Sequence, residues 1–284
     1  MHAATITAAF RFACETEIAA LKPGNVHAYA PGHGMTHTDF LRSAEVAAPA
    51  LCRAGAGLGE RILQALTETR AAVGQNTNLG ILLLCAPLAM AAEAGGEFRA
   101  SLRMVLAAAD IADADAVFRA IVLASPGGLG EAPRHDVRRA ATVTLHSAMT
   151  EAADRDSIAQ QYVDEFSEIF GIGCPAYAAA LARGWTSPWA AVAVHLAFLA
   201  RIPDSHVRRK YGPATATALQ QEAAPWHARL AATGDPESLV PDLLAWDAHL
   251  KQRGLNPGTT ADLTVASIFA HTLRGVLRPA DMDG

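Results

Sequence analysis

Apolar residues recur at helical spacing along most of the chain. In the first segment Ile6, Phe10, Ala13 and Glu17 fall on one helical face, and later segments repeat this spacing with Ala and Leu, which are strong helix formers. No segment combines apolar–polar alternation with an enrichment in β-branched side chains. The pattern therefore predicts an all-α fold, a single multi-helix, bundle-like domain over residues 1–284 with its site at the helix ends.

Pro, Gly and short polar segments separate the expected helices. The first helix ends at the turn 22–24. The later helices are expected at about 39–54, 60–72, 98–109, 114–123, 137–152, 157–170, 175–183, 188–200, 214–233, 237–252 and 260–277. A further apolar run, Ile81–Ala92, contains Pro87 and is too short to span a bilayer.

Five polar clusters stand where helical segments begin or end. They are KPGNVH (22–27), QNTNLG (75–80), GGLGEAPRHD (127–136), PDSHVRRKYG (203–212) and GLNPGTTADL (254–263). Helix N-termini expose unpaired N–H groups and carry a partial positive charge, so they bind anions, and glycine lets the backbone approach a ligand closely. Each cluster taken alone is also explained as a helix cap, an ordinary turn or a solvated face. Taken together, the five are predicted to converge on one cleft.

Two groups of titratable residues stand out near the N-terminus. Glu17 lies on the apolar stripe of the first helix, and a buried carboxylate needs a partner or a task. We therefore predict that Glu17 faces the cleft near Lys22 or Asn25. His27, His33 and His37 share one short loop, and their irregular spacing leaves metal ligation open as an alternative to a structural role.

Composition narrows the classes of function. The chain is 51% apolar and 18% charged, which favours a sizeable core over disorder, and its formal net charge of −5 with scattered basic residues argues against nucleic acid as a partner. Cys14, Cys52, Cys85 and Cys174 form no CxxC pair and are expected to be buried, reduced thiols. The N-terminus has no basic segment typical of a signal peptide. These features predict a cytoplasmic protein without a membrane partner, and a homodimer is left open.

In their order and spacing, the clusters resemble the triphosphoribosyl-dephospho-CoA synthase family. The resemblance runs from Glu17 to Asp262 and rests on KPGNVH, NTNLG before an Ala/Leu-rich helix, GLGEA and LNPGTTADL. It implies an all-helical transferase that moves a 5-triphosphoribosyl group from ATP to the ribose 2′-hydroxyl of 3′-dephospho-CoA and releases adenine. The product of that reaction is a precursor of the prosthetic group of certain acyl carrier proteins.

The chain departs from the family pattern at several polar positions. Asn78 and Leu79 replace the His and Lys of NTHKG, Gly128 and Leu129 replace the Ala and Arg of GARGEA, and His27 stands where an acid is usual. Two cations that would each form a charge-assisted bond to phosphate are thus missing. The loss favours a smaller phosphate load, such as a 5-phosphate. The cations that remain are Lys22, Arg208, Arg209 and Lys210.

The resemblance and the chemistry of ribosyl transfer select the candidate residues. Such transfer passes through an oxocarbenium-like state that carboxylates stabilise, and it needs a base for the acceptor hydroxyl. The predicted catalytic acids are Glu17, Glu131, Asp204 and Asp262. Of these, Glu131, Asp204 and Asp262 would also hold Mg²⁺, with Asp136 a weaker candidate. The predicted substrate-binding residues are Lys22, Asn25, His27, Asn76, Thr77, Asn78, Gly80, His206, Arg208, Arg209, Lys210, Asn256 and Thr259.

The QNTNLG cluster is predicted to act both as a helix cap and as a ligand contact. The helix that it begins would point its N-terminus into the cleft. Its N–H groups, with the side chains of Asn76 and Thr77, would then meet a phosphate or ribose oxygen, and Gly80 would allow close approach.

Three functions are compatible with these residues. The first is the family reaction, with ATP as donor, in the biosynthesis of a cofactor or prosthetic group. The second is phosphoribosyl transfer from phosphoribosyl pyrophosphate to a ribitol-type alcohol, as in the synthesis of a tetrahydromethanopterin-like one-carbon carrier. The third is a non-catalytic, nucleotide-binding helical protein. In each case the partners are small nucleotide or phosphoribosyl compounds.

Overall fold

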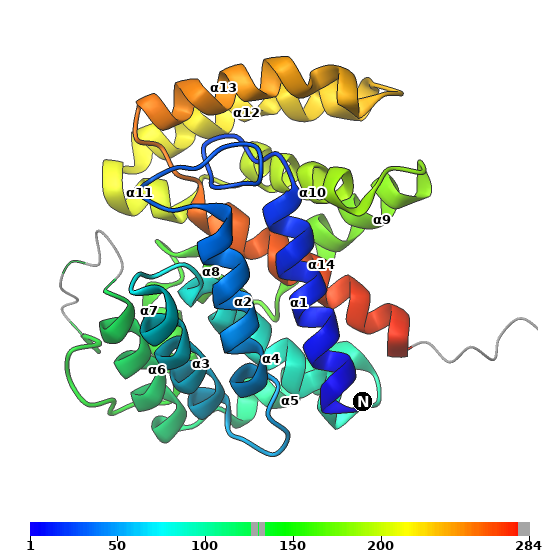
Figure 1. The fold of residues 1–284 in the computed structure, drawn as a ribbon. Helices are drawn as coiled ribbons and strands as arrows, with labels where there is room; N and C mark the ends of the chain where they lie inside the picture. The colour runs from blue at the N-terminus through cyan, green and yellow to red at the C-terminus, as the bar shows by residue number, and fades with distance from the viewer. Residues whose placement is uncertain (126–129, 131–133, 278–284) are drawn as a thin grey trace, which may run out of the picture.

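The computed structural model describes residues 1–125, 130 and 134–277, and these form fourteen α-helices and no strand (Figure 1). The predicted all-α fold is therefore confirmed. The α-helices are α1 (Ala3–Ala19), α2 (His37–Leu51), α3 (Leu58–Val73), α4 (Leu79–Ala94), α5 (Phe98–Ala108), α6 (Ile111–Ala124), α7 (Leu145–Ala152), α8 (Ser157–Val163), α9 (Cys174–Ala182), α10 (Ser187–Arg201), α11 (Ser205–Tyr211), α12 (Pro213–Ala232), α13 (Val240–Gln252) and α14 (Gly258–Leu277). A π-helix, Ile169–Gly173, and a 3-10 helix, Pro236–Leu239, complete the regular structure.

Two apolar helices, α4 and α14, form the centre of the core. Every residue from Leu79 to Ala89 in α4 is buried, as expected for a helix that is apolar on all sides, and the helix continues through Pro87. Helix α14 packs against α1, α4, α9 and α10 and crosses the middle of the molecule (Figure 1). The N-termini of both helices come from polar clusters, so packing of the core places these clusters in the interior.

The segment between α1 and α2 is held against α13. It forms two tight turns, closed by the bridges His27–Ala30 and Gly32–Met35. The backbone N–H of Gly24 donates to Asp247 Oδ1 at 2.8 Å, and Lys251 Nζ donates to the carbonyl of Ala30 at 3.3 Å. These contacts fix the N-terminal cluster beside the C-terminal part of the chain.

The helix predicted at 137–152 is half as long in the structure. Helix α7 begins only at Leu145, because the side chain of Thr144 caps it by accepting from Ser147 N at 3.3 Å. The cap replaces the continued helix, and 136–143 form turns and irregular backbone.

The helix predicted at 157–170 is also interrupted. Helix α8 ends at Val163, and Glu165 and Phe166 then adopt positive φ angles of 56° and 62°. The apolar spacing does not reveal this break, because Phe166 is fully buried and keeps its place in the core.

One helix was not expected from the sequence. The cluster 203–212, expected between helices, contains the short helix α11.

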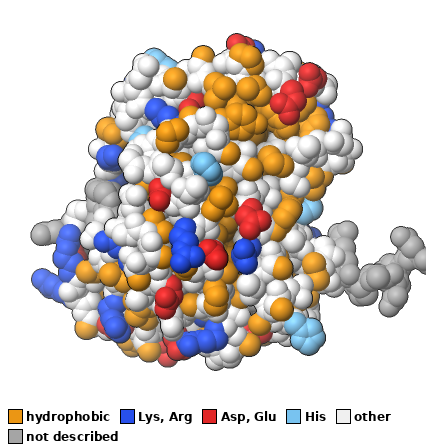
Figure 2. All heavy atoms as spheres, in the orientation of Figure 1, with side chains coloured by type: hydrophobic (Ala, Val, Ile, Leu, Met, Phe, Trp, Pro, Cys, Tyr) orange, Lys and Arg blue, Asp and Glu red, His pale blue; other side chains and the backbone are white. Residues whose placement is uncertain are grey.

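Three further features concern helix length, the cysteines and the surface charge. Within the described residues, no single helix is both long and apolar enough to cross a membrane, and α4 and α5, which pass together on length and composition, bend by 118° at their junction. All four cysteines are buried and unpaired, as predicted. Figure 2 shows Lys and Arg side chains interspersed with Asp and Glu on one face of the molecule.

Candidate active site

Residues of all five polar clusters line one cavity of about 920 Å³, so the predicted convergence on a single cleft is confirmed. The predicted site residues on its wall are Glu17, Asn25, Asn76, Thr77, Asn78, Gly80, Asp136, His206, Arg208, Arg209, Asn256, Thr259 and Asp262. Four other predicted residues, Lys22, His27, Asp204 and Lys210, are not on this wall. Glu131 lies outside the residues that the structure describes.

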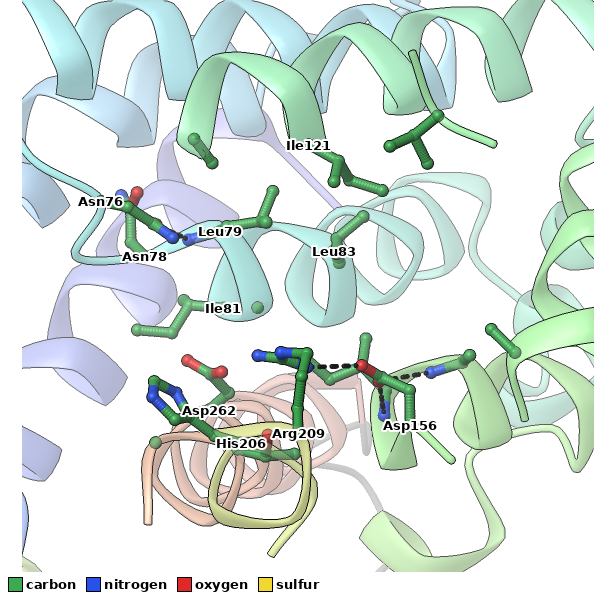
Figure 3. A pocket seen from close by; sticks show the side chains of 18 of the residues that line it. Asn76, Asn78, Leu79, Ile81, Leu83, Ile121, Asp156, His206, Arg209 and Asp262 are labelled. Carbon is green, nitrogen blue, oxygen red and sulfur yellow. Dashed lines mark hydrogen bonds and ion pairs between the residues drawn. The ribbon is translucent and has the colours of Figure 1, made fainter. Parts of the chain in front are cut away.

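The cavity has two unlike sides. On one side, the first turns of α4 and the facing helices α6 and α7 present an apolar wall, formed by Leu79, Leu83, Val117, Ile121 and Met149. On the other side, Asp156, His206, Arg209 and Asp262 come from α8, α11 and α14 (Figure 3). The polar chemistry of the site is therefore concentrated on one side of α4.

Three arginines gather at the turn between α7 and α8 and form an arginine wall, defined as Arg155, Arg208 and Arg209. Arg208 Nη1 donates to the carbonyl of Asp154 at 2.8 Å, and Arg155 Nη1 lies 3.3 Å from Asp154 Oδ1. Arg209 Nη1 lies 3.1 Å from Asp156 Oδ2 (Figure 3). All three line the cavity. Such a group of guanidinium ions is suited to phosphate. Sequence reasoning missed Arg155 because no motif residue marks this turn.

Glu17 lies where the sequence predicts it. It lines the cavity although its residue is only 3% exposed, and it forms an ion pair with Lys22. Lys22 Nζ also donates to Asn25 Oδ1 at 3.2 Å, and Asn25 Nδ2 donates to Asn256 Oδ1 at 2.8 Å. Burial raises the pKa of the Glu17 carboxyl, and Lys22 opposes this shift. The network ties the end of α1 to the turn before α14.

This network corrects the role predicted for Lys22. The side chain is fully buried and is absent from the cavity wall, so it cannot bind a phosphate directly as the structure stands. Burial lowers the pKa of its ammonium group, and the Glu17 carboxylate opposes that shift. Lys22 therefore contacts Glu17 and Asn25 rather than the cavity itself.

The turns KPGN and NPGT are packed together. Gly24 has a φ of +83°, and a Cβ atom there would lie 2.9 Å from Pro257 Cδ and 3.1 Å from the carbonyl oxygen of Leu255. Both the left-handed backbone and the close approach require glycine. The two clusters that are farthest apart in sequence thus form one rigid part of the site.

Asp262, in the second turn of α14, lies against α4. A Cβ atom on Gly80 would be only 2.0 Å from Asp262 Oδ2, so glycine is needed there to admit the carboxylate. No hydrogen bond to the Asp262 carboxylate occurs among the described residues. Burial raises the pKa of Asp262, and the carboxylates of Glu17, Asp204 and Asp156 raise it further, whereas Arg209 lowers it.

This arrangement changes the interpretation of Gly80 and of the α4 N-terminus. The sequence predicted that Gly80 opens the first turn to a ligand phosphate. The structure instead places the Asp262 carboxylate against that turn (Figure 3). An anion is favoured at a helix N-terminus, and here the protein supplies it. A phosphate at the same place would be repelled by Asp262.

Of the three residues predicted to cap α4, only Asn76 does so through its side chain, whereas Thr77 and Asn78 bond to neighbouring helices. Asn76 Oδ1 accepts from Leu79 N at 3.1 Å, the hydroxyl of Thr77 is hydrogen-bonded to Ser43, and Asn78 Nδ2 donates to Thr69 Oγ1 at 2.9 Å. The Asn78 Oδ1 atom is buried and has no partner among the described residues, although the residue lines the cavity. The amide oxygen of Asn78 is therefore a buried acceptor behind the cavity wall, unpaired within the described part of the chain.

Asp204 has a capping role in the structure. Its residue is 2% exposed, and its carboxylate accepts from Val207 N at 2.9 Å, Thr260 N at 2.8 Å and Thr260 Oγ1 at 2.8 Å. It therefore joins the start of α11 to the start of α14. With both oxygens already engaged and no place on the cavity wall, Asp204 does not fit the metal-ligand and catalytic roles predicted for it.

Two further predicted contacts lie off the cavity. His27 is fully buried and its Nε2 is 3.3 Å from Asp247 Oδ1, so Asp247 provides an acid next to the position where the family has one. Lys210 is exposed, with its Nζ 5.5 Å from the centre of the Tyr211 ring. Neither residue is placed to contact a ligand in the cavity.

His206 does line the cavity. Burial, together with the charges of Arg209 and Lys210, lowers its pKa to about 4, so its imidazole is neutral near pH 7. A neutral imidazole can donate or accept one hydrogen bond but adds no charge to bind a phosphate.

The loop histidines form no metal-binding group with the other described residues. The described residues contain no group of three or more His, Cys, Asp or Glu side chains that could hold a metal ion. His33 Nε2 is instead hydrogen-bonded to the carbonyl of Gly24 at 2.8 Å, and His37 begins α2. The histidines of this loop therefore support its fold.

Comparisons with known proteins agree on one family. Residues 3–279 match the family model described as ATP:dephospho-CoA triphosphoribosyl transferase. A crystal structure from Archaeoglobus fulgidus, of a protein assigned as a triphosphoribosyl-dephospho-CoA synthase, superposes with a TM-score of 0.62 at 25% identity. The match covers 83% of this chain and 99% of that one. A search of curated proteins found no match.

Proposed function

The chain belongs to the ATP:dephospho-CoA triphosphoribosyl transferase family, and we propose that its cavity binds both substrates of that family's reaction. The family transfers a triphosphoribosyl group from ATP to dephospho-CoA. The observation that supports the assignment of the cavity is the presence of the arginine wall and the acids Glu17 and Asp262 in one space of about 920 Å³. These are the charges that a phosphorylated donor and a cation-like transition state require.

The triphosphate of ATP is proposed to lie at the arginine wall. Bonds between guanidinium groups and phosphate are charge-assisted and are stronger than neutral hydrogen bonds. The apolar wall offers no cation, and the N-terminus of α4 is next to the Asp262 carboxylate. The ribose would then extend from the arginine wall toward α4.

The two acids have separate tasks in this proposal. The Asp262 carboxylate would stabilise the positive charge that develops at the ribose C1′ atom. Glu17 would accept the proton of the acceptor hydroxyl as the hydroxyl oxygen bonds to C1′. At the same time the bond from C1′ to adenine breaks, and adenine leaves with the electron pair of that bond. Glu17 suits the second task because Lys22 favours its ionised form.

Magnesium fits one side of this site. The Asp262 carboxylate has no hydrogen-bond donor among the described residues, and neighbouring carboxylates raise its pKa. A divalent cation at Asp262 would relieve this repulsion, and Mg²⁺ commonly joins one or two carboxylates to substrate phosphates. When bound, the ion would supply screening of the phosphate charge. Glu131 stays a prediction as a second ligand.

The direct test is an assay of the purified protein with ATP, dephospho-CoA and Mg²⁺. We expect release of adenine and a product whose mass equals dephospho-CoA plus the triphosphoribosyl group, both measured by liquid chromatography and mass spectrometry. Glu17→Gln is the matched control, and it should bind ATP but release adenine at least about 100-fold more slowly. ATP binding by the wild type without adenine release would favour a non-catalytic nucleotide-binding protein.

A donor with less phosphate is the second candidate, and it rests on Leu79. This residue stands on the apolar wall where the family pattern has a lysine, and no cation from α4 faces the cavity. Phosphoribosyl pyrophosphate with a ribitol-type acceptor would place less charge there. Transfer from that donor, with none from ATP, would favour this candidate. The cytoplasmic location and the homodimer stay predictions from the sequence.

A further inference from the structure

Lys22 is a buried cation that contacts no proposed substrate. Its residue is 0% exposed, and it lies behind Glu17 as seen from the cavity, since Glu17 lines the wall and Lys22 does not. A buried charge is costly unless it is paired and hydrogen-bonded. Lys22 satisfies this condition through Glu17 and Asn25.

The place of Lys22 is fixed by contacts outside the cavity. Asn25, its second partner, is held by the Asn256 side chain, and Gly24 between them donates its N–H to Asp247. The left-handed backbone of Gly24 allows the turn to pack on Pro257. The ammonium group is therefore held by a rigid turn, and it cannot follow a ligand into the cavity.

The charged and titratable groups around the pair come from several elements. Those that act on Glu17 or Lys22, or on which the pair acts, are Cys14 of α1, His27 of the turn, His195 of α10, Lys251 of α13 and Asp262 of α14. Among the described residues, Lys22 is the group that lowers the pKa of Glu17, whereas burial raises it. No other cation among the described residues lowers the pKa of Glu17.

We propose that Lys22 is a positioning residue that keeps Glu17 ionised and directs its carboxylate to the cavity. The proposal rests on the function proposed above, in which Glu17 is the base. Without Lys22, Glu17 would be an unpaired carboxylate at a buried site, and such groups take up a proton. A protonated Glu17 cannot accept the proton of the acceptor hydroxyl.

The direction of the pH effect follows. Glu17 works in its ionised form, so activity falls as the pH drops through its pKa. Lys22 lowers the pKa of Glu17, and burial raises it. Without Lys22, only the effect of burial is left, so the pKa of Glu17 rises. The acid limb of the kcat profile should therefore move to higher pH in Lys22→Met.

The experiment compares wild type, Lys22→Met, Glu17→Gln and the double variant, with Lys251→Met as the matched control. Lys251 is a partly buried lysine of α13, paired with Asp247 at 2.9 Å. In Lys22→Met we expect kcat at pH 7 to fall about tenfold or more, with KM for ATP changed less than about twofold. The double variant should have the kcat of Glu17→Gln. Lys251→Met should lower the melting temperature without moving the acid limb.

Infrared spectroscopy provides a readout that is independent of turnover. At neutral pH, Lys22→Met should show one additional protonated-carboxyl band when its spectrum is compared with those of the wild type and the double variant. Absence of this band, an unmoved acid limb, or a raised KM for ATP with unchanged kcat would overturn the proposal. If the wild type transfers nothing, the proposed function fails, while the infrared band still tests Lys22. Lys22→Gln gives the same comparison if Lys22→Met folds poorly.

Discussion

The arginine wall and the apolar wall face the same cavity but are built differently. The arginine wall is held by polar contacts to the turn between α7 and α8, at Asp154 and Asp156, and its guanidinium groups are partly exposed. The apolar wall belongs to the core, because Leu79 and Leu83 lie on the buried part of α4. Charge can be accommodated at the first wall and not at the second. A substrate with one charged end and one uncharged end would therefore bind in one orientation.

Asp262 lies between the two walls, and its replacement should have the largest effect. Asp262→Asn removes the charge proposed to stabilise the transition state, so kcat should fall about 100- to 1,000-fold in the adenine-release assay. Because burial raises the pKa of Asp262, ionisation of this group disfavours folding, and the variant should keep or raise its melting temperature at pH 7. A lower melting temperature with unchanged kcat would assign Asp262 to structure alone.

Gly80→Ala tests whether the first turn of α4 needs a glycine to leave room for the Asp262 carboxylate. The new Cβ atom would lie 2.0 Å from Asp262 Oδ2 and 2.7 Å from Ile158 Cδ1, so these atoms must move. We expect about 1–3 kcal/mol of destabilisation and about a 100-fold loss of kcat. The matched control is Gly275→Ala in α14, where a Cβ atom meets nothing within 4 Å. This control should leave kcat unchanged, and an equally harmless Gly80→Ala would contradict the account.

Arg209→Met tests the charged wall directly. Loss of one charge-assisted bond to phosphate should weaken ATP binding by about 1.5–3 kcal/mol, or roughly 10- to 100-fold, measured by calorimetry. Lys210→Met is the control on the same helix, and it should change ATP affinity less than about twofold because Lys210 is not on the cavity wall. Equal effects of both variants would mean that overall charge, rather than the arginine wall, attracts ATP.

Leu79→Lys should have the smallest effect on ATP. If the triphosphate lies at the arginine wall, the family's lysine at this position changes ATP affinity less than about twofold, which is no more than about 0.4 kcal/mol. The same lysine places a charge in the apolar wall, so KM for the acceptor should rise. A clear gain in ATP affinity would instead indicate that the wild type has adapted to a donor with less phosphate.

The helices were largely predictable because Ala/Leu periodicity and Pro/Gly turns are local signals. The exceptions have tertiary causes. The break after α8 depends on the backbone of Glu165 and Phe166, whose side chains fit a helical pattern equally well. Helix α11 was hidden within a polar cluster, because its caps and cations resemble loop residues.

The sequence predicted which polar clusters form the candidate site, but it did not predict the role of each residue in them. Motif order located Glu17 and Asp262 on the cavity. It could not show that Lys22 and Asp204 are buried partners of other groups, since a buried and a ligand-facing polar residue look alike in sequence. Arg155 was missed because it reaches the cavity only where the turn between α7 and α8 meets α11.

The most direct test of the two-wall account is a crystal structure of the wild-type protein with ATP and Mg²⁺, without acceptor so that no transfer occurs. The account predicts that the triphosphate contacts Arg155, Arg208 and Arg209, and that the ribose C1′ atom faces Asp262. A triphosphate lying against Leu79 and the rest of the apolar wall would contradict it.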